Sequence, residues 1–192
     1  MNSPLELPAA SLLSPRRSLP ALMEGKPAAA ATVFFAVSNA AITSMFCFLL
    51  KAQLPGLERT LINPQYVLSL FLPKLLFPAL SVVIIHFLSR VLFGSKGDLK
   101  TFYASYLCLL AMPVIAGGLL NIGLYWLVLS GTAHAAALAP FNLAAKAVNL
   151  IWTLAITITV IIAVYRIRFW QSLLVWAAQM LPFVVFSHYF RG

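Results

Sequence analysis

Histidine, serine and acidic side chains are the residues of this chain that could carry out chemistry. Ser187 and His188 combine the residue types of a serine hydrolase, but sequence neighbours point apart on a helix, so the histidine cannot activate the serine. The predicted membrane topology places His86 near the inner membrane face and His134 and His188 toward the outside. A haem or metal held between helices needs ligands at matching depth, which these histidines do not offer, so the sequence predicts no cofactor and no metal site. Since no catalytic group of residues remains, the sequence also predicts no enzyme.

The acidic residues lie outside the long apolar stretches, at Glu6, Glu24, Glu58 and Asp98. Proton-coupled and sodium-coupled transporters usually keep ionisable groups near the middle of the bilayer, so this distribution argues against such coupling. Gly97, Lys100 and Thr101 around Asp98 superficially resemble a phosphate-binding loop, but the glycine-to-lysine spacing is wrong and no strand precedes the loop. We expect Asp98 to be the N-cap of the following helix, accepting hydrogen bonds from its free amide groups.

Small and polar residues at a spacing of four form the remaining candidate contact surfaces. Such residues let helices approach closely and form hydrogen bonds in lipid. They are Ala36, Ala40 and Ser44, then Asn149, Thr153 and Thr157, with Gln179 alone near the middle of the last apolar stretch. We interpret them as packing faces within the chain, with a surface for a partner protein as the alternative.

Composition makes lipid the solvent for most of the chain. Of its 192 residues, 62% are hydrophobic and 9% are charged, whereas soluble domains carry roughly a quarter charged residues. The uncharged stretch 28–50 would form a helix about 35 Å long, enough to cross a hydrocarbon core about 30 Å thick. We predict an all-α polytopic bundle of five transmembrane helices, at about 28–50, 67–93, 102–129, 143–165 and 169–189.

The flanking features fit this division. Residues 1–27 hold five of the twelve prolines together with several basic residues, which predicts a cytoplasmic tail with a short interfacial helix around residues 19–23. Cys47 and Cys108 lie inside apolar runs, so we expect small buried residues rather than disulfide or metal partners.

Lysine and arginine positions predict the orientation, since basic segments resist translocation. With the N-terminus inside, the inner side holds Arg16, Arg17, Lys26, Arg90, Lys96, Lys100, Arg166 and Arg168, against Lys51, Arg59, Lys146, Arg191 and the borderline Lys74 outside. Five spans then place the C-terminus outside. The formal charge of +9 is explained by orientation and by contact with anionic headgroups, so we expect no nucleic-acid partner.

Several segments resemble the bacterial branch of the YIP family, named for proteins that interact with Ypt and Rab GTPases. They are Ser14-Pro15 followed by residues 19–23, the glycine-bounded loop 93–101, Tyr103, Tyr106 and Pro113, Ile151-Trp152, and Arg166 with Arg168. The resemblance implies five spans, an inward N-terminus and an outward C-terminus. It also implies little chemistry: eukaryotic members are associated with trafficking and bind lipidated GTPases, while bacterial members often look like accessory proteins of transporters.

We therefore expect a non-enzymatic accessory or structural subunit of a larger assembly in a bacterial cytoplasmic membrane, in contact with other integral membrane proteins and with lipids. A homo-oligomer stays open. One alternative is a small carrier or channel for a neutral solute or lipid, lined by Asn149, Thr153, Thr157 and Gln179. Another is a trafficking factor that binds lipidated partners through the tail and the 96–100 loop.

Overall fold

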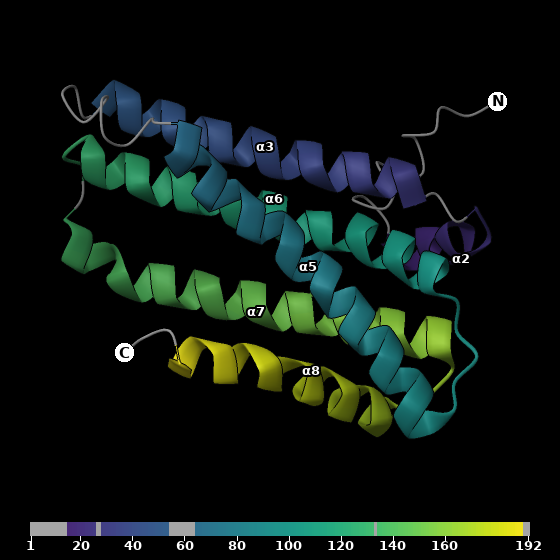
Figure 1. The fold of residues 1–192 in the computed structure, drawn as a ribbon. Helices are drawn as coiled ribbons and strands as arrows, with labels where there is room; N and C mark the ends of the chain where they lie inside the picture. The colour runs from purple at the N-terminus through teal and green to yellow at the C-terminus, as the bar shows by residue number, and fades with distance from the viewer. Residues whose placement is uncertain (1–14, 26–27, 54–63, 133, 190–192) are drawn as a thin grey trace.

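The computed structural model describes residues 15–25, 28–53, 64–132 and 134–189, and its regular elements in these ranges are all α-helices (Figure 1). They are α2 (Pro15–Gly25), α3 (Ala28–Gln53), α5 (Pro64–Phe93), α6 (Leu99–Leu129), α7 (Ala135–Tyr165) and α8 (Phe169–Tyr189). Four stretches are long and apolar enough to cross a membrane: Ala28–Leu50, Phe71–Phe93, Leu99–Leu129 and Ala136–Tyr165. The all-α prediction is thus confirmed, with four helices of transmembrane length and composition.

The helix bounds differ most from the expected spans at α7, which begins at Ala135 rather than near residue 143. The run before residue 143 is also apolar, and α7 accommodates Pro140 near its start, as helices in lipid tolerate proline when neighbours satisfy the freed groups. α8 covers the range expected for the fifth span. In the tail, α2 is longer than the short helix expected there, and it packs against α6 with Leu19 and Leu22 buried.

The structure does not describe every residue that the sequence analysis names. Glu6, Ser14, Lys26, Glu58, Arg59 and Arg191 lie outside the described residues, and the side chains of Arg16, Arg17, Lys51, Ser187 and His188 are likewise not described.

α6 is the central helix of the bundle: it contacts α2, α3, α5 and α7, most extensively α3 (Figure 1). Two adjacent glycines permit these approaches. A side chain at Gly118 would overlap Ile42 of α3, and a Cβ at Gly117 would lie 3.0 Å from the Asn149 amide nitrogen of α7. In lipid, where apolar side chains gain little by leaving the solvent, close packing of this kind holds helices together.

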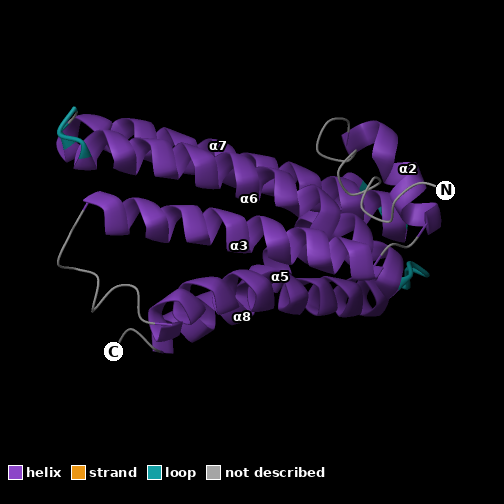
Figure 2. Ribbon diagram, turned by 90° about the horizontal axis from the view of Figure 1, so that it is seen from above, coloured by secondary structure: helices purple, strands orange, loops and turns teal. Residues whose placement is uncertain are grey.

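The buried core lies in one half of the bundle. All residues of α6 from Thr101 to Ala111 are buried except Tyr103, while beyond Pro113 none is. In α7 the buried residues begin only at Ile156. We call the end formed by α2 and residues 94–98 and 166–168 the packed end, and the half toward residues 130–134 the open half. Figure 2 shows the helices lying closest at the packed end and spreading apart toward the other.

Polar side chains within the helices are satisfied mostly by their own backbone. Ser38 donates to the Phe34 carbonyl at 2.8 Å, and Asn39 donates to the Phe35 carbonyl at 3.0 Å. The buried stripe of α3 consists of Ala31, Phe35, Asn39, Thr43 and Cys47, again at a spacing of four. The predicted stripe is offset from it by one residue, so that Ala36 and Ala40 are half-buried and Ser44 is exposed. Cys47 and Cys108 are buried, as predicted.

The contact between α3 and α6 predicts that Gly118→Ala lowers stability. The new methyl group would overlap Ile42, whose β-branched side chain cannot easily move aside, so we expect the melting temperature in detergent to fall by several degrees. Gly123→Ala is the matched control, because nothing lies within 4 Å of that position. Unfolding is measured with a thiol-reactive dye that reports exposure of Cys47 and Cys108. Equal melting temperatures for the two variants would contradict the close approach.

Candidate functional site

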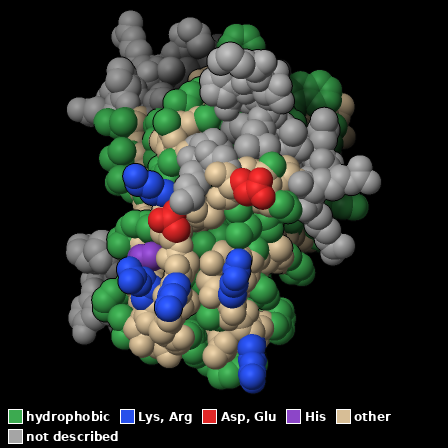
Figure 3. All heavy atoms as spheres, turned by 90° about the vertical axis from the view of Figure 1, so that its right-hand side faces the viewer, with side chains coloured by type: hydrophobic (Ala, Val, Ile, Leu, Met, Phe, Trp, Pro, Cys, Tyr) green, Lys and Arg blue, Asp and Glu red, His purple; other side chains and the backbone are tan. Residues whose placement is uncertain are grey.

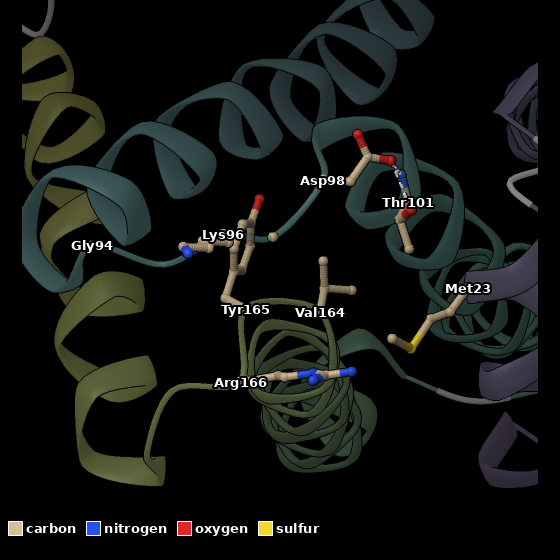
Figure 4. Close-up of a pocket in the computed structure, with 9 residues that line it drawn as sticks. Met23, Gly94, Lys96, Asp98, Thr101, Val164, Tyr165 and Arg166 are labelled. Atoms are coloured by element: carbon tan, nitrogen blue, oxygen red, sulfur yellow. Dashed lines mark hydrogen bonds between the residues drawn. The ribbon is translucent and has the colours of Figure 1, made fainter.

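A hollow of about 640 Å³ lies at the packed end, and three segments distant in sequence form it. Figure 4 shows Met23 and Asp98 on one side, Lys96 on the other and Arg166 across the base. The lining residues are Met23 from α2, Gly94, Lys96, Gly97 and Asp98 from the connection between α5 and α6, Thr101 from α6, and Val164, Tyr165 and Arg166 from the end of α7.

Asp98 is the N-cap of α6, as predicted. Its Oδ2 accepts hydrogen bonds from the Thr101 amide at 3.0 Å and from the Thr101 hydroxyl at 2.8 Å. The carboxylate therefore lies against the positive end of the helix, where the helix dipole favours a negative charge. This fixes the wall of the hollow where α6 begins.

Tyr165 contacts several segments at the packed end. Its hydroxyl lies 2.9 Å from His86 Nδ1 on α5, and its ring packs against Phe102 of α6 with centroids 5.2 Å apart. Gly97 passes so close to this ring that a Cβ there would overlap it. The sequence predicted for His86 only a position near the inner membrane face. A pairing with a tyrosine on another helix leaves no local signal in the sequence.

Arg166 holds an unusual backbone conformation at the end of α7. Its φ of 54° and ψ of 34° are left-handed, and it is the one non-glycine residue in the described ranges with a positive φ. Glycine is the usual residue where a helix ends this way, and a side chain there costs roughly 1 kcal/mol. Residues held in such conformations cluster at functional sites. The turn places the guanidinium group at the base of the hollow (Figure 4).

Basic side chains gather at this end, and two of them, Lys96 and Arg166, line the hollow. Arg90, Lys96, Lys100, Arg166 and Arg168 are all exposed and all belong to the packed end. Figure 3 looks onto this end and shows Lys and Arg side chains grouped beside acidic ones. The predicted loop residues Lys96, Asp98, Lys100, Arg166 and Arg168 are therefore brought to one surface, which we call the basic surface.

The other residues singled out in the sequence lie in separate contacts. Asn149 is half-buried beside Gly117, and Thr153 is half-buried one turn further along α7. Thr157 is buried in the half of the bundle that holds the core, and its hydroxyl donates to the Thr153 carbonyl at 2.7 Å. Gln179 is buried on α8, and its Oε1 has no hydrogen-bond partner within the described residues. Across those same ranges, no three metal-ligating side chains come together.

The fold and this site define the class: an all-α protein with several helices suited to a membrane and a basic, hollowed surface at one end. No protein-family model, no curated protein and no solved structure matches the chain.

The hydrogen bond between His86 and Tyr165 predicts a measurable coupling between α5 and α7. Tyr165→Phe keeps the ring but removes the hydroxyl, so the free energy of unfolding should fall by about 1 kcal/mol. His86→Ala and the double variant complete a cycle in detergent, followed by thermal unfolding. The double variant should lose less than the sum of the two single losses, because both remove the same bond. Strictly additive losses would show that the two side chains do not interact.

Proposed function

We propose that this chain is a non-enzymatic accessory subunit of a larger assembly in a bacterial cytoplasmic membrane, and that it binds its partner through the packed end. The observation that carries the proposal is the construction of that end. The tail helix α2, the 94–98 connection and the turn after α7 together form one hollow inside one basic surface. Such a composite surface presents a shape and a charge that no single segment provides.

The same surface supports a cytoplasmic packed end and therefore a cytoplasmic N-terminus. Of the lysine and arginine side chains that the structure describes, Arg90, Lys96, Lys100, Arg166 and Arg168 belong to this end, whereas Lys74 and Lys146 lie in the open half. Basic residues favour the cytoplasmic side. α8 begins beside Arg168 and is 21 residues long, about 32 Å, so a fifth crossing would place the C-terminus outside.

The chemistry of the partner follows from the charges. Among the described residues at this end, Asp98 and Glu24 are the acids, and Asp98 caps α6. Arg166 and Lys96 face the hollow from different sides, which suits an extended segment that carries more than one carboxylate (Figure 4). We therefore propose an acidic cytoplasmic segment of another integral membrane protein as the occupant, guided by charge complementarity.

Membership of the YIP family stays a prediction, and with it a second candidate function. A trafficking factor was expected to bind lipidated partners through the tail and the 96–100 loop. Met23 of the tail helix and Lys96 of that loop line the same hollow, which favours this candidate over a transport path. A lipidated peptide and an acidic peptide of equal length, each competing for the hollow, distinguish the two functions.

Topology is tested by reporters fused before Met1 and after Gly192 in a bacterial host. With five crossings, a cytoplasmic reporter should be active at the N-terminus and an externally active reporter at the C-terminus. A cytoplasmic reporter inserted after Lys96 should match the N-terminal one. Both termini on one side would exclude an odd number of crossings.

Arg166→Gly separates stability from partner binding. Glycine relieves the left-handed conformation, so the melting temperature should stay the same or rise, while recovery of a partner cross-linked at position 96 should fall several-fold. Lys146→Gln, which removes a charge in the open half, is the control and should leave recovery unchanged. A soluble polyglutamate peptide should compete with the partner. Equal recovery with Arg166→Gly, or a native mass that shows the chain alone, would contradict the proposal.

A further inference from the structure

A second polar hollow, of about 260 Å³, lies in the open half of the bundle, far from the site described above. All four helices of transmembrane length contribute to it. Its polar lining consists of Thr43 from α3, Lys74 from α5, Asn121 and Tyr125 from α6, and Asn142 and Lys146 from α7. The sequence treated Lys74 and Lys146 as separate cations near membrane surfaces, whereas the structure brings them to one pocket.

The depth of this pocket matches a lipid boundary. Along α7, Lys146 lies about 30 Å from Arg166, and along α5, Lys74 lies about 24 Å from Arg90. A hydrocarbon core is about 30 Å thick, so the pocket lies near the far boundary when the basic surface lies at the near one. Phosphate and glycerol groups of membrane lipids occupy that boundary.

The two lysines lack a carboxylate partner within the described residues. The acids in those ranges, Glu24 and Asp98, both belong to the packed end. Lys74 Nζ donates to the Thr43 hydroxyl at 3.4 Å, which is a long bond to a neutral group. Both lysine side chains are exposed, and two ammonium groups that share a pocket repel each other, so an anion placed between them would be favoured.

A buried acceptor in the same place also lacks a partner. Asn142 lines the pocket, and its Oδ1 has less than 1 Å² exposed and no hydrogen bond within the part of the chain described. A buried carbonyl oxygen without a donor costs roughly 1–3 kcal/mol. The pocket therefore offers two cations to an anion and one acceptor to a hydroxyl group, a combination that suits a phosphate ester linked to glycerol.

An apolar groove adjoins this pocket. It measures about 510 Å³ and runs between α6 and α7, lined by side chains such as Leu120, Leu124 and Phe141. A smaller hollow of about 220 Å³ lies between the groove and the polar pocket. It shares the lining residue Leu124 with the groove, and Tyr125 and Asn142 with the polar pocket. This apolar continuation favours an amphiphile over a free anion.

We propose that the open half of the bundle binds an anionic phospholipid, with its phosphate between Lys74 and Lys146 and an acyl chain along the groove between α6 and α7. This site is independent of the partner surface at the packed end. The proposed orientation decides only which leaflet of the bilayer supplies the phospholipid, namely the outer one.

The test is native mass spectrometry of the full chain in detergent, titrated with phosphatidylglycerol and with diacylglycerol of the same acyl chains. The wild-type chain should retain phosphatidylglycerol at least tenfold more strongly, because diacylglycerol has no phosphate. The double variant Lys74→Gln, Lys146→Gln should lose this preference, and Lys74→Arg, Lys146→Arg should keep it. Lys96→Gln, Lys100→Gln removes the same charge at the packed end and should change nothing.

Three further measurements decide between the occupants. Ala145→Trp, which fills the groove, should weaken binding of phosphatidylglycerol while the chain stays folded by the thiol-dye assay. Inorganic phosphate at millimolar concentration should not displace the lipid; displacement would show a free-anion site and overturn the proposal. Retention of the phosphatidylglycerol preference in the double glutamine variant, with its melting temperature unchanged, would overturn it as well.

Discussion

The close approach of α6 to its neighbours is the constraint on which the rest of the structure depends. Lipid offers little reward for burying apolar side chains, so helices associate where their surfaces fit closely and polar groups pair. α6 begins at a fixed N-cap, packs tightly through its first half and allows α3 and α7 to come near at Gly117 and Gly118. The other helices are positioned directly or indirectly by these contacts, since α8 packs mainly against α5 and α7, which themselves contact α6.

This constraint divides the molecule into two halves with different properties. At the packed end, Tyr165 contacts α5, α6 and the 94–98 connection, so the loops there have defined positions. In the open half the same helices spread apart, and the space between them is lined by lysine and asparagine side chains beside an apolar groove. A rigid end suits recognition by a protein, whereas an open half exposed to the bilayer suits occupation by lipid.

The distribution of charge follows the same division. The cations of the packed end are exposed, and basic residues at the ends of apolar helices help to orient a chain in a membrane. Lys74 and Lys146 are exposed as well, but they share one pocket that adjoins an apolar groove, where an anion between the two ammonium groups would be favoured. Arg166 combines a charge with an unusual backbone, because its left-handed conformation lies where its side chain lines the hollow.

The sequence by itself determined the all-α class, the apolar character of the long helices, the N-cap at Asp98 and the burial of Cys47 and Cys108. These features depend on composition, on local hydrogen bonding and on apolar run length, which are all readable along the chain. Only the tertiary structure decided that the buried stripe of α3 runs through Asn39 and Thr43 rather than Ala40 and Ser44, because helix rotation is set by the neighbour. For the same reason it alone decided that His86 contacts Tyr165 and that Lys74 and Lys146 line one pocket. Each of these pairs is far apart in sequence, and nothing local specifies which faces of two uniformly apolar helices turn toward one another.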